Sequence, residues 1–216
     1  SPEITDIETD NAQMQNDINC LTGNPEIGDY CYGGIVFYVE EGEEGKYGLV
    51  AALEDLPESY RWGCYEMEIF GADGHSIGTG LQNTIDLVSG CTESPIAASE
   101  ALAYEFGGYS DWYLPSKEEL LEIYNTIGQG SGTGNIGDFS DDWYWSSTKD
   151  NNASAWGLIF TDGFSGNANQ NGFHSVRPIR SFGNWTMGCM DSLACNYNPE
   201  ANMADGSCEY PDDGYD

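Results

Sequence analysis

Carboxylate and amide side chains gather around the last three cysteines of the chain, in the segment GCMDSLACNYNPEANMADGSCEYPDDGYD. Closely spaced oxygen donors, with glycines that permit tight turns, suit calcium, which takes about six to eight oxygen ligands in flexible geometry. The alternative is a solvated acidic linker held only by disulfides. We favour calcium because the donors cluster around cysteines in a segment with almost no aliphatic residues. The predicted ligands are Asp191, Asn196, Asn198, Asp205 and Asp212.

Aromatic and amide side chains occur together near Trp143 and in the segment FSGNANQNGFH, which we expect to be a loop. Aromatic faces contact apolar patches of a ligand and amides hydrogen-bond its hydroxyl groups, as on surfaces that bind neutral sugars or proteins. Trp145, Trp156 and Phe160 lie in strand-like runs, so we expect them in the core. The candidate ligand-binding residues are Trp143, Asn167, Asn169 and Asn171.

Catalytic motifs are not evident. The two histidines, His75 in GADGHSIGTG and His174 in GFHSVRP, lie in no nucleophile elbow, zinc motif or phosphate loop. The glycine-rich GQGSGTGNIG lacks the Gly-Lys-Ser/Thr ending of a phosphate-binding loop, and a flexible loop is expected there. We therefore expect the chain not to be an enzyme.

The charge of the chain is strongly acidic, with 6 Lys and Arg against 37 Asp and Glu and a net charge of -31. Such a surface repels nucleic acids, anionic glycans and acidic lipid headgroups, which leaves cations, neutral sugars and proteins as partners. The sequence has neither a signal peptide nor an apolar run long enough to span a bilayer. We expect a processed or excised part of an exported, soluble protein, with no membrane insertion.

Seven cysteines without a CxxC pair indicate an oxidising compartment and disulfides rather than a zinc site. Cys20 and Cys31 flank a short loop, and Cys64 and Cys91 flank a long one, so we pair them in this way; an interchain bridge is the alternative for Cys20. Each bridge would contribute roughly 3 to 4 kcal/mol. The odd count leaves one thiol whose partner we expect beyond this chain or in a neighbouring one. The other disulfide candidates are Cys189, Cys195 and Cys208.

Apolar residues recur at heptad spacing in residues 1–22, which predicts an amphipathic helix. The segment is too short to be stable alone, so it is either the end of an oligomeric stalk or a helix packed on the main domain. We favour the stalk because the other faces are almost wholly polar. The heptad positions are Ile4, Ile7, Asn11, Met14, Ile18 and Leu21.

Residues 23–183 predict an α+β domain with two helices among antiparallel strands. Residues 35–39 and 47–53 read as a hairpin with an acidic loop. One helix is predicted from an N-cap at Ser94 to Gly107. The apolar runs WYWSST, AWGLIF and SVRPIRSF supply further strands.

The motif GGYSDWYLPSKEEL starts the second helix. Ser116 and Glu119 form an S-x-x-E capping box, and Gly128 ends the helix. Trp112 and Leu114 are expected in the core. Asp111 is expected to pair with a buried arginine, either Arg177 or Arg180.

Blocks across residues 27–182 resemble the Lcl C-terminal-domain-like family of bacterial surface proteins. The resemblance implies a C-type-lectin-like fold at the tip of a surface protein, an adhesive role and a trimeric assembly. The chain departs from the family in its charge, which would repel sulfated glycans, and it lacks the triplets with which sugar-binding C-type lectins hold calcium. The blocks are GGIVFYV, GLVAA, WGC, IGTGLQNT, GGYSDWYLPSKEEL, IGDF, YWSST, AWGLIF and VRPIRSF.

Residues 184–216 resemble a second pattern, the GCTDxxACNYNPxAxxxDGSCEY repeat of large secreted bacterial proteins. The chain is therefore expected to be an extracellular adhesion module that binds a neutral glycan or protein multivalently, as a homo-oligomer with a trimer favoured. The alternative is a structural subunit of a surface filament or virion fibre. An enzyme of the formylglycine-generating kind is disfavoured because the cysteines look structural.

Overall fold

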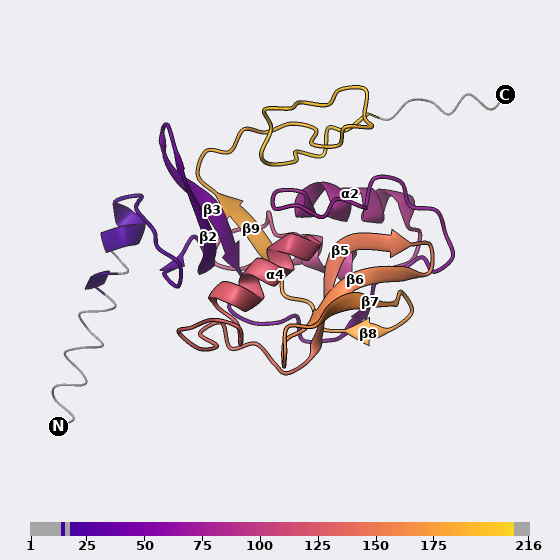
Figure 1. Ribbon diagram of the computed structural model, residues 1–216, viewed down its shortest axis with the longest axis horizontal. Coiled ribbons are helices and arrows are strands. Elements are labelled where there is room, and N and C mark those ends of the chain that lie inside the picture. Colours follow the sequence, from indigo (N-terminus) through magenta and orange to yellow (C-terminus); the bar gives the residue numbers. More distant parts are fainter. Residues whose placement is uncertain (1–13, 16–17, 210–216) are drawn as a thin grey trace.

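The first sheet joins the two ends of the main domain (Figure 1). The protein was analysed as a computed structural model, which describes residues 14–15 and 18–209. The predicted hairpin is confirmed, but its first strand is longer, its second strand begins and ends two residues earlier, and its turn is tighter than expected. All neighbours are antiparallel, and the spatial order is β1 (Tyr30–Cys31), β2 (Gly34–Gly42), β3 (Gly45–Ala51) and β9 (Ile179–Phe182).

A second sheet is formed by the C-terminal half of the domain. Its antiparallel strands are consecutive, so it is a meander, and a short separate ribbon lies against β5 through β8. The segment FSGNANQNGFH, expected to be a loop, instead supplies β7 and β8. The strands are β5 (Trp143–Asn151), β6 (Ser154–Ile159) and β7 (Ser165–Asn169), and the ribbon pairs β4 (Tyr60–Arg61) with β8 (Phe173–His174).

Helix α4 (Lys117–Thr126) has the predicted capping box. The Glu119 backbone N–H donates to Ser116 Oγ over 3.3 Å, and the Ser116 N–H donates to Glu119 Oε2 over 2.6 Å. At the other end, the Gly128 N–H donates to the Ile123 carbonyl over 2.9 Å, which closes the last turn. Both predicted boundaries of this helix are confirmed.

Helix α3 (Ala97–Ala103) is shorter than predicted, and Ser94 is not its N-cap. The peptide bond between Ser94 and Pro95 is cis. Ile96 has an extended backbone, with φ -131° and ψ 163°, and the helix begins after it. The Ile96 N–H donates to Ser99 Oγ over 3.0 Å, which satisfies the donor at the helix start. The prediction failed because Pro95 and Ile96 precede the helix, and the capping hydroxyl comes from Ser99 inside the first turn.

Helix α2 (Gly80–Gly90) was not predicted, and the expectation of only two helices in the domain is wrong. Its apolar residues Leu81, Ile85 and Val88 follow helical spacing, but glycines border the segment and no side chain caps its start. The Thr84 hydroxyl bonds both the carbonyl and the N–H of Leu114, at 3.1 and 3.2 Å. Tertiary contacts thus hold a helix whose local signals are weak.

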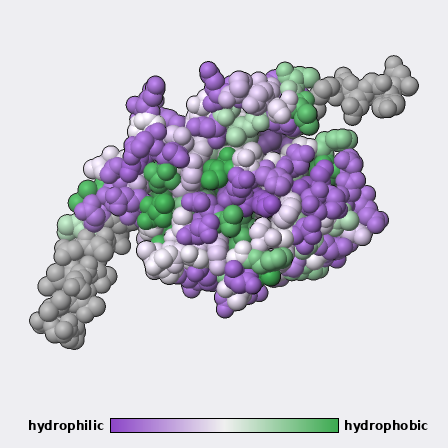
Figure 2. All heavy atoms as spheres, in the orientation of Figure 1, coloured by the Kyte–Doolittle hydropathy of each residue, from purple (hydrophilic) through white to green (hydrophobic). Residues whose placement is uncertain are grey.

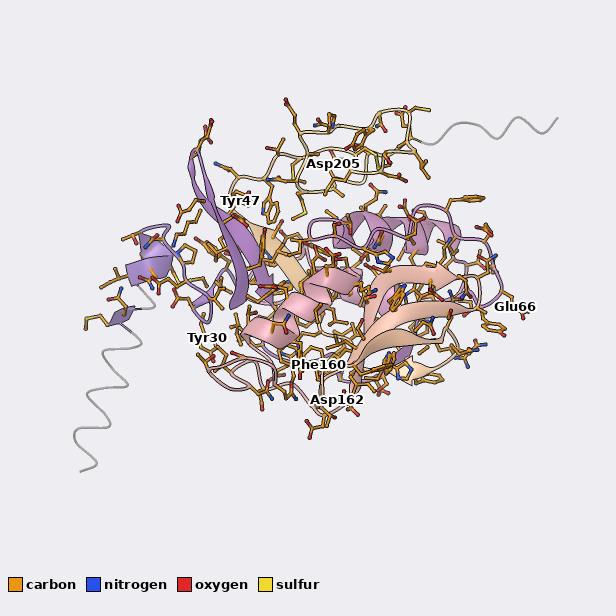
Figure 3. All side chains as sticks on the ribbon, viewed as in Figure 1. Tyr30, Tyr47, Glu66, Phe160, Asp162 and Asp205 are labelled. Atoms are coloured by element: carbon orange, nitrogen blue, oxygen red, sulfur yellow. A yellow bond between two sulfur atoms is a disulfide. The ribbon has the colours of Figure 1, made fainter. Side chains whose placement is uncertain are left out.

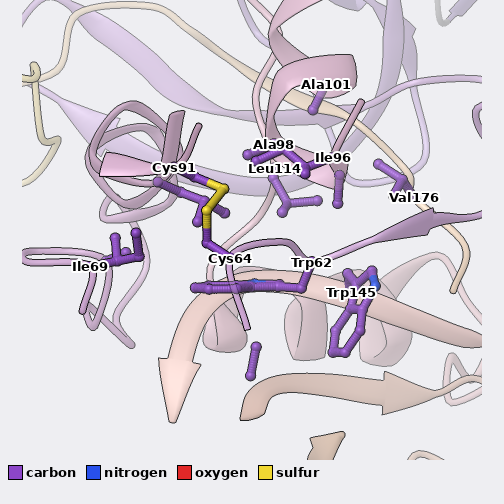
Figure 4. Close-up of a cluster of buried hydrophobic side chains, with 14 of the residues drawn as sticks. Trp62, Cys64, Ile69, Cys91, Ile96, Ala98, Ala101, Leu114, Trp145 and Val176 are labelled. Atoms are coloured by element: carbon purple, nitrogen blue, oxygen red, sulfur yellow. A yellow bond between two sulfur atoms is a disulfide. The ribbon is translucent and has the colours of Figure 1, made fainter. Parts of the chain in front are cut away.

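Buried side chains form three clusters. The first surrounds the Cys64–Cys91 disulfide, which lies beside Trp62 (Figure 4), and includes Trp145. The second lies between α4 and the two larger sheets, and the third packs Trp112 against the outer face of β2 and β3. As predicted, Trp112, Leu114, Trp145 and Phe160 are fully buried. Each contributes about 1.5–3 kcal/mol through removal of apolar surface from water.

Two arginines tie distant loops to the core. Arg180 makes the predicted pair with Asp111, through Nε to Oδ1 at 2.6 Å and Nη2 to Oδ2 at 2.8 Å. The pair is less buried than expected, because the Asp111 side chain is 56% exposed. Arg177 is fully buried and pairs with Asp55 at 2.6 Å.

The tail segment, residues 184–209 of those described, lies along α2 and the top of β3 (Figure 1). Met203 is fully buried in the second cluster, and the Ala204 N–H donates to the Gly78 carbonyl over 2.8 Å. Asn202 Nδ2 donates to the Tyr47 hydroxyl over 3.1 Å, and Figure 3 shows Tyr47 on the side of β3 that the tail covers. The tail is therefore anchored to the domain by a core side chain as well as by its own disulfide, Cys189–Cys208.

The described part of the N-terminal helix leaves its heptad positions in solvent. Met14, Ile18 and Leu21 are exposed, while Asn19 is buried and donates to Asp29 Oδ2 over 2.9 Å. The Cys20–Cys31 disulfide fastens this buried side to β1. Ile4, Ile7 and Asn11 lie outside the described residues. None of the helices in the described ranges combines the length and apolar character needed to cross a membrane.

Candidate functional site

Trp156 of β6 is half-buried, although we expected it in the core. Alternate residues of β6 face opposite sides of the sheet, so Trp156 shares a side with Leu158, which α4 covers. Helix α4 begins at Lys117, next to Trp156. The side chain of Lys117 lies over the indole, with Nζ 3.4 Å from the ring centroid. The capping box fixes the residue at which α4 begins, and therefore the point at which this helix stops covering the sheet.

Amide and carboxylate groups border this indole. Asn167 of β7 is the cross-strand partner of Trp156, so both side chains project from the same face. Asn167 Nδ2 donates to Asp150 Oδ2 over 2.9 Å, and the Ser154 hydroxyl donates to the same oxygen over 2.8 Å. The His75 ring lies 6.0 Å from the indole in an edge arrangement. We call this surface the Trp156 patch; its members are Trp156, Asn167, Asp150, Lys117 and His75.

Trp143 lies on the opposite face of the same sheet. Its indole covers Gly157 and Gly166, where an added Cβ would come within 2.2 and 3.5 Å of Trp143 atoms. Its ring also contacts His174, at a centroid distance of 5.7 Å. The structure thus separates Trp143 from Asn167, because FSGNANQNGFH is a strand with two faces and not a loop. Sequence reasoning missed Trp156 because its partial exposure depends on where α4 begins.

The other two candidate asparagines lie near the β7–β8 turn. Asn169 and Asn171 are exposed, and the Asn171 N–H donates to Asn169 Oδ1 over 2.9 Å, so one amide serves the turn. Nearby, Phe173 is 59% exposed and the Arg61 guanidinium lies 5.0 Å from its ring centroid. Arg61 and Phe173, but neither asparagine, line a hollow of about 720 Å³ that Glu93 also lines. This hollow was not predicted.

The predicted calcium ligands of the tail mostly serve its own turns. Asp191, Asn198 and Asp205 each accept a hydrogen bond from a backbone N–H two residues further along the chain, at 2.8, 3.1 and 3.0 Å. Asn196 accepts one from the Glu209 N–H over 2.9 Å. Asp212 lies outside the described residues. Within the described ranges, no three His, Cys, Asp or Glu side chains are grouped to hold a metal ion, and calcium in the tail stays a prediction.

Both predicted disulfides of the domain are present, and Cys195 is exposed and unpaired within the described residues. Its partner in another chain stays a prediction. Three disulfides in these ranges fit an oxidising compartment.

Burial perturbs two carboxyl groups near the start of α4 and on α2. It raises the pKa of Glu119 to about 7. Hydrogen bonds from backbone N–H groups act in the opposite direction and lower this pKa, and the largest such effect comes from Ser116. It also raises the pKa of Asp86 to about 6, against a hydrogen bond from Gln82; the charges of Asp73 and Asp191 raise that pKa further. Glu119 is explained by its capping role, but no structural role accounts for Asp86.

On the Trp156 patch, a half-buried indole with the Lys117 ammonium over its ring lies beside an exposed amide, Asn167, and an exposed carboxylate, Asp150. Such a combination stacks against an apolar ligand face and exchanges hydrogen bonds with hydroxyl groups. The face shown in Figure 2 is mostly hydrophilic, with hydrophobic residues in small separate areas. The patch thus offers polar groups beside a partly covered aromatic ring, and its five members include no nucleophile paired with a base.

A family model described as the Lcl C-terminal domain matches residues 59–180, more than half of the chain. No curated protein matches. Among solved structures, the chain is similar to the crystal structure of a fimbrial protein from Bacteroides ovatus ATCC 8483, with 14% identity and a TM-score of 0.43. The similarity covers 72% of this chain and 44% of the fimbrial protein. The chain thus spans less than half of that protein, and so low a score supports no argument about fold or function.

Proposed function

This chain belongs to the Lcl C-terminal domain family, and from that premise we propose that it is an extracellular or surface binding module that recognises a neutral glycan or a protein. The Trp156 patch is the observation that carries the proposal. Its half-buried indole, with the Lys117 ammonium over the ring, lies beside the exposed Asn167 and Asp150 in the matched region. A net charge of -31 disfavours anionic ligands.

A C-type-lectin-like architecture and an adhesive role are part of this proposal. The pairing of β3 with β9 supports it, because it brings the two ends of residues 34–182 into one sheet. A domain whose two ends lie in one sheet can display its other sheet, which carries the Trp156 patch, on the side away from the point where the domain is attached.

We also propose that the N-terminal helix assembles the chain into a homo-oligomer, with a trimer favoured. Support comes from Met14, Ile18 and Leu21, whose side chains are 60, 46 and 87% exposed. A helix packed on its own domain would bury these heptad positions instead. Assembly would multiply weak ligand contacts, because tethered sites bind with a raised effective concentration.

A glycan array with the full chain tests the ligand proposal. We expect binding to at least one neutral glycan, lost in Trp156→Ala and weakened in Asn167→Ala. Asn171→Ala is the matched control, because it removes an exposed amide from the same segment but away from the patch. Equal loss in the control, or retention of binding without the indole, would contradict the assignment of the patch.

The exposed heptad face also favours a second candidate, a structural subunit of a surface filament or fibre. Assembly through that face needs no ligand site. Silence of the oligomeric chain on glycan and protein arrays, with assembly lost in Leu21→Asp, would support this candidate over adhesion.

A further inference from the structure

Strand β7 lies at the edge of the sheet that it forms with β5 and β6 (Figure 1). Just before this strand, the Ile159 N–H donates to the Phe164 carbonyl over 2.9 Å, and just after it the Gln170 N–H donates to the Ala153 carbonyl over 3.1 Å. In an antiparallel pair, every second residue directs its backbone groups to the neighbouring strand. The register between β6 and β7 is unbroken, so the even-numbered residues of β7 face β6.

The odd-numbered residues of β7 direct their backbone N–H and C=O groups away from the sheet. These residues are Ser165, Asn167 and Asn169, of which both asparagines are exposed. Of their backbone groups, only the Asn169 carbonyl has a hydrogen-bond partner in the part of the chain that the structure describes, the Gly172 N–H at 2.8 Å. The outer edge of β7 therefore presents a row of donors and acceptors with which an added strand can pair.

The other edges of the two larger sheets are short or covered. Strand β1 has 2 residues. Along β5, the N–H groups of Trp145, Ser147 and Lys149 donate to carbonyls outside the sheet, at 3.1, 2.7 and 2.6 Å. On β9, Ile179 exchanges two backbone hydrogen bonds with Tyr113, at 2.8 and 2.9 Å. Natural sheets commonly protect their edges in these ways, so the open edge of β7 is an exception within this domain.

The segment that carries this edge is uncharged and has an exposed aromatic side chain. Residues 164–173, FSGNANQNGF, include no charged residue and no proline, although the chain has 37 Asp and Glu. Phe164 is 57% exposed, and its ring lies against Gly166, where an added Cβ would come within 2.6 Å of Phe164 Cε1. Charges and prolines are the side chains that usually prevent strand addition, and here an apolar surface takes their place.

Two exposed carboxylates border the same edge. Asp150 Oδ2 accepts from Asn167 Nδ2 over 2.9 Å, on the face opposite Phe164. Asp162 projects from the turn that leads into β7 (Figure 3), and its Oδ1 accepts from the Phe164 N–H over 3.0 Å. Neither carboxylate forms an ion pair with a Lys or Arg among the described residues. A basic side chain on an added strand would therefore be attracted to this edge.

We propose that the β7 edge binds an extended segment of a partner protein, in which apolar side chains that contact Phe164 alternate with lysine or arginine side chains on the face of Asp150. Main-chain hydrogen bonds to the outward groups of β7 hold the segment, and its alternating side chains give specificity. A second copy of this chain fits less well, because it brings two strongly acidic surfaces together. The site is distinct from the Trp156 patch, since it uses the backbone of Asn167 and not its side chain.

Isothermal titration calorimetry and site-resolved hydrogen exchange of the full, oxidised chain test the edge. The probe is an end-blocked peptide of alternating lysine and valine, about eight residues long, which is within the usual length of a strand. We expect binding that slows exchange of the Ser165, Asn167 and Asn169 N–H groups. The same peptide methylated on its backbone nitrogens keeps its charge but cannot donate main-chain hydrogen bonds, and should bind more than about tenfold more weakly. Replacement of its lysines by glutamate should have an effect of similar size.

Two variants at one position separate the backbone of β7 from its side chains. Ser165→Pro removes an outward N–H from the first residue of an edge strand, where proline is tolerated, and should weaken binding about fivefold. Ser165→Ala keeps this N–H and is the matched control, with the affinity of the unmodified chain expected. If Ser165→Pro lowers the unfolding temperature, the methylated peptide still decides, because it leaves the protein unchanged.

Four results would overturn the proposal. The first is no binding of the lysine–valine peptide, and the second is equal binding of its methylated form, which would assign the interaction to charge alone. The third is slowed exchange at amides other than those of β7, which would place the peptide elsewhere. The fourth is slowed exchange of the β7 amides without peptide as the protein concentration rises, which would make a second copy of this chain the occupant.

Discussion

Deletion of the Glu119 side chain should be among the most damaging single changes in the domain. The residue is fully buried. Its Oε2 accepts from the Ser116 N–H over 2.6 Å, its Oε1 accepts from the Gly78 N–H over 2.8 Å, and the Gly80 backbone also bonds it. One carboxylate therefore joins the start of α4 to the loop that leads into α2 and supports the tail.

The expected cost of Glu119→Ala follows from these donors. Each buried N–H left without an acceptor costs about 1–3 kcal/mol, so three of them would cost about 3–9 kcal/mol. Water that enters the vacated space satisfies part of this, and loss of a buried charge offsets more. We expect a net loss of about 3–4 kcal/mol, a large part of the ~5–15 kcal/mol that stabilises a typical domain.

Urea unfolding of the oxidised chain, followed by tryptophan fluorescence, measures this loss. Glu119→Gln keeps one acceptor oxygen and should lose about 1–2 kcal/mol. Glu118→Gln, an exposed carboxylate in the same helical turn, is the control and should change stability by less than about 0.5 kcal/mol. A loss below about 1 kcal/mol for Glu119→Ala would refute the idea that this carboxylate holds the loop.

Two further expectations concern charge. Because burial raises the pKa of Glu119 to about 7 from 4.5, the folded chain binds more protons between these values than the unfolded chain, so stability falls as pH rises from about 4.5 to 7. The urea midpoint of unfolding should change less between pH 5 and pH 8 in Glu119→Gln than in the unmodified chain. If the change is the same in both, groups other than Glu119 cause the pH dependence of stability. Asp111→Ala should cost about 1–2 kcal/mol, with no change in glycan binding, because Arg180 stays buried against the Tyr32 carbonyl and the Tyr109 ring. A loss of ligand binding at unchanged stability would instead place Asp111 in the site.

Local sequence signals predicted those elements that depend on neighbouring residues alone. Ser116 and Glu119 are three positions apart, so the capping box could be recognised without knowledge of the fold. The pairing of Cys64 with Cys91 and the burial of Trp112 were likewise predicted. Helix α2 was missed because its start has no capping side chain, and α3 was misplaced because its capping hydroxyl comes from Ser99 inside the first turn and not from the serine before Pro95.

The candidate ligand site shows where such signals stop. The sequence supplied Asn167 but grouped it with Trp143, because it could not show that FSGNANQNGFH is a strand. Once β7 forms, the alternation of its side chains sends Asn167 to the face of Trp156 and away from Trp143. The exposure of Trp156 depends in turn on where α4 begins relative to β6, a relation between elements distant in sequence.

The sequence by itself determined the cap of α4, the hairpin and the cysteine pairs Cys20–Cys31 and Cys64–Cys91, because these follow from short-range spacing, and its ordered motif blocks resembled the family. Only the tertiary structure decided how deeply each aromatic side chain is buried and that Met203 anchors the tail in the core. It alone left the outer edge of β7 without a paired strand among the described residues. The physical reason is that burial and the pairing of backbone groups depend on which distant segment covers each surface, and packing settles that for the whole chain at once.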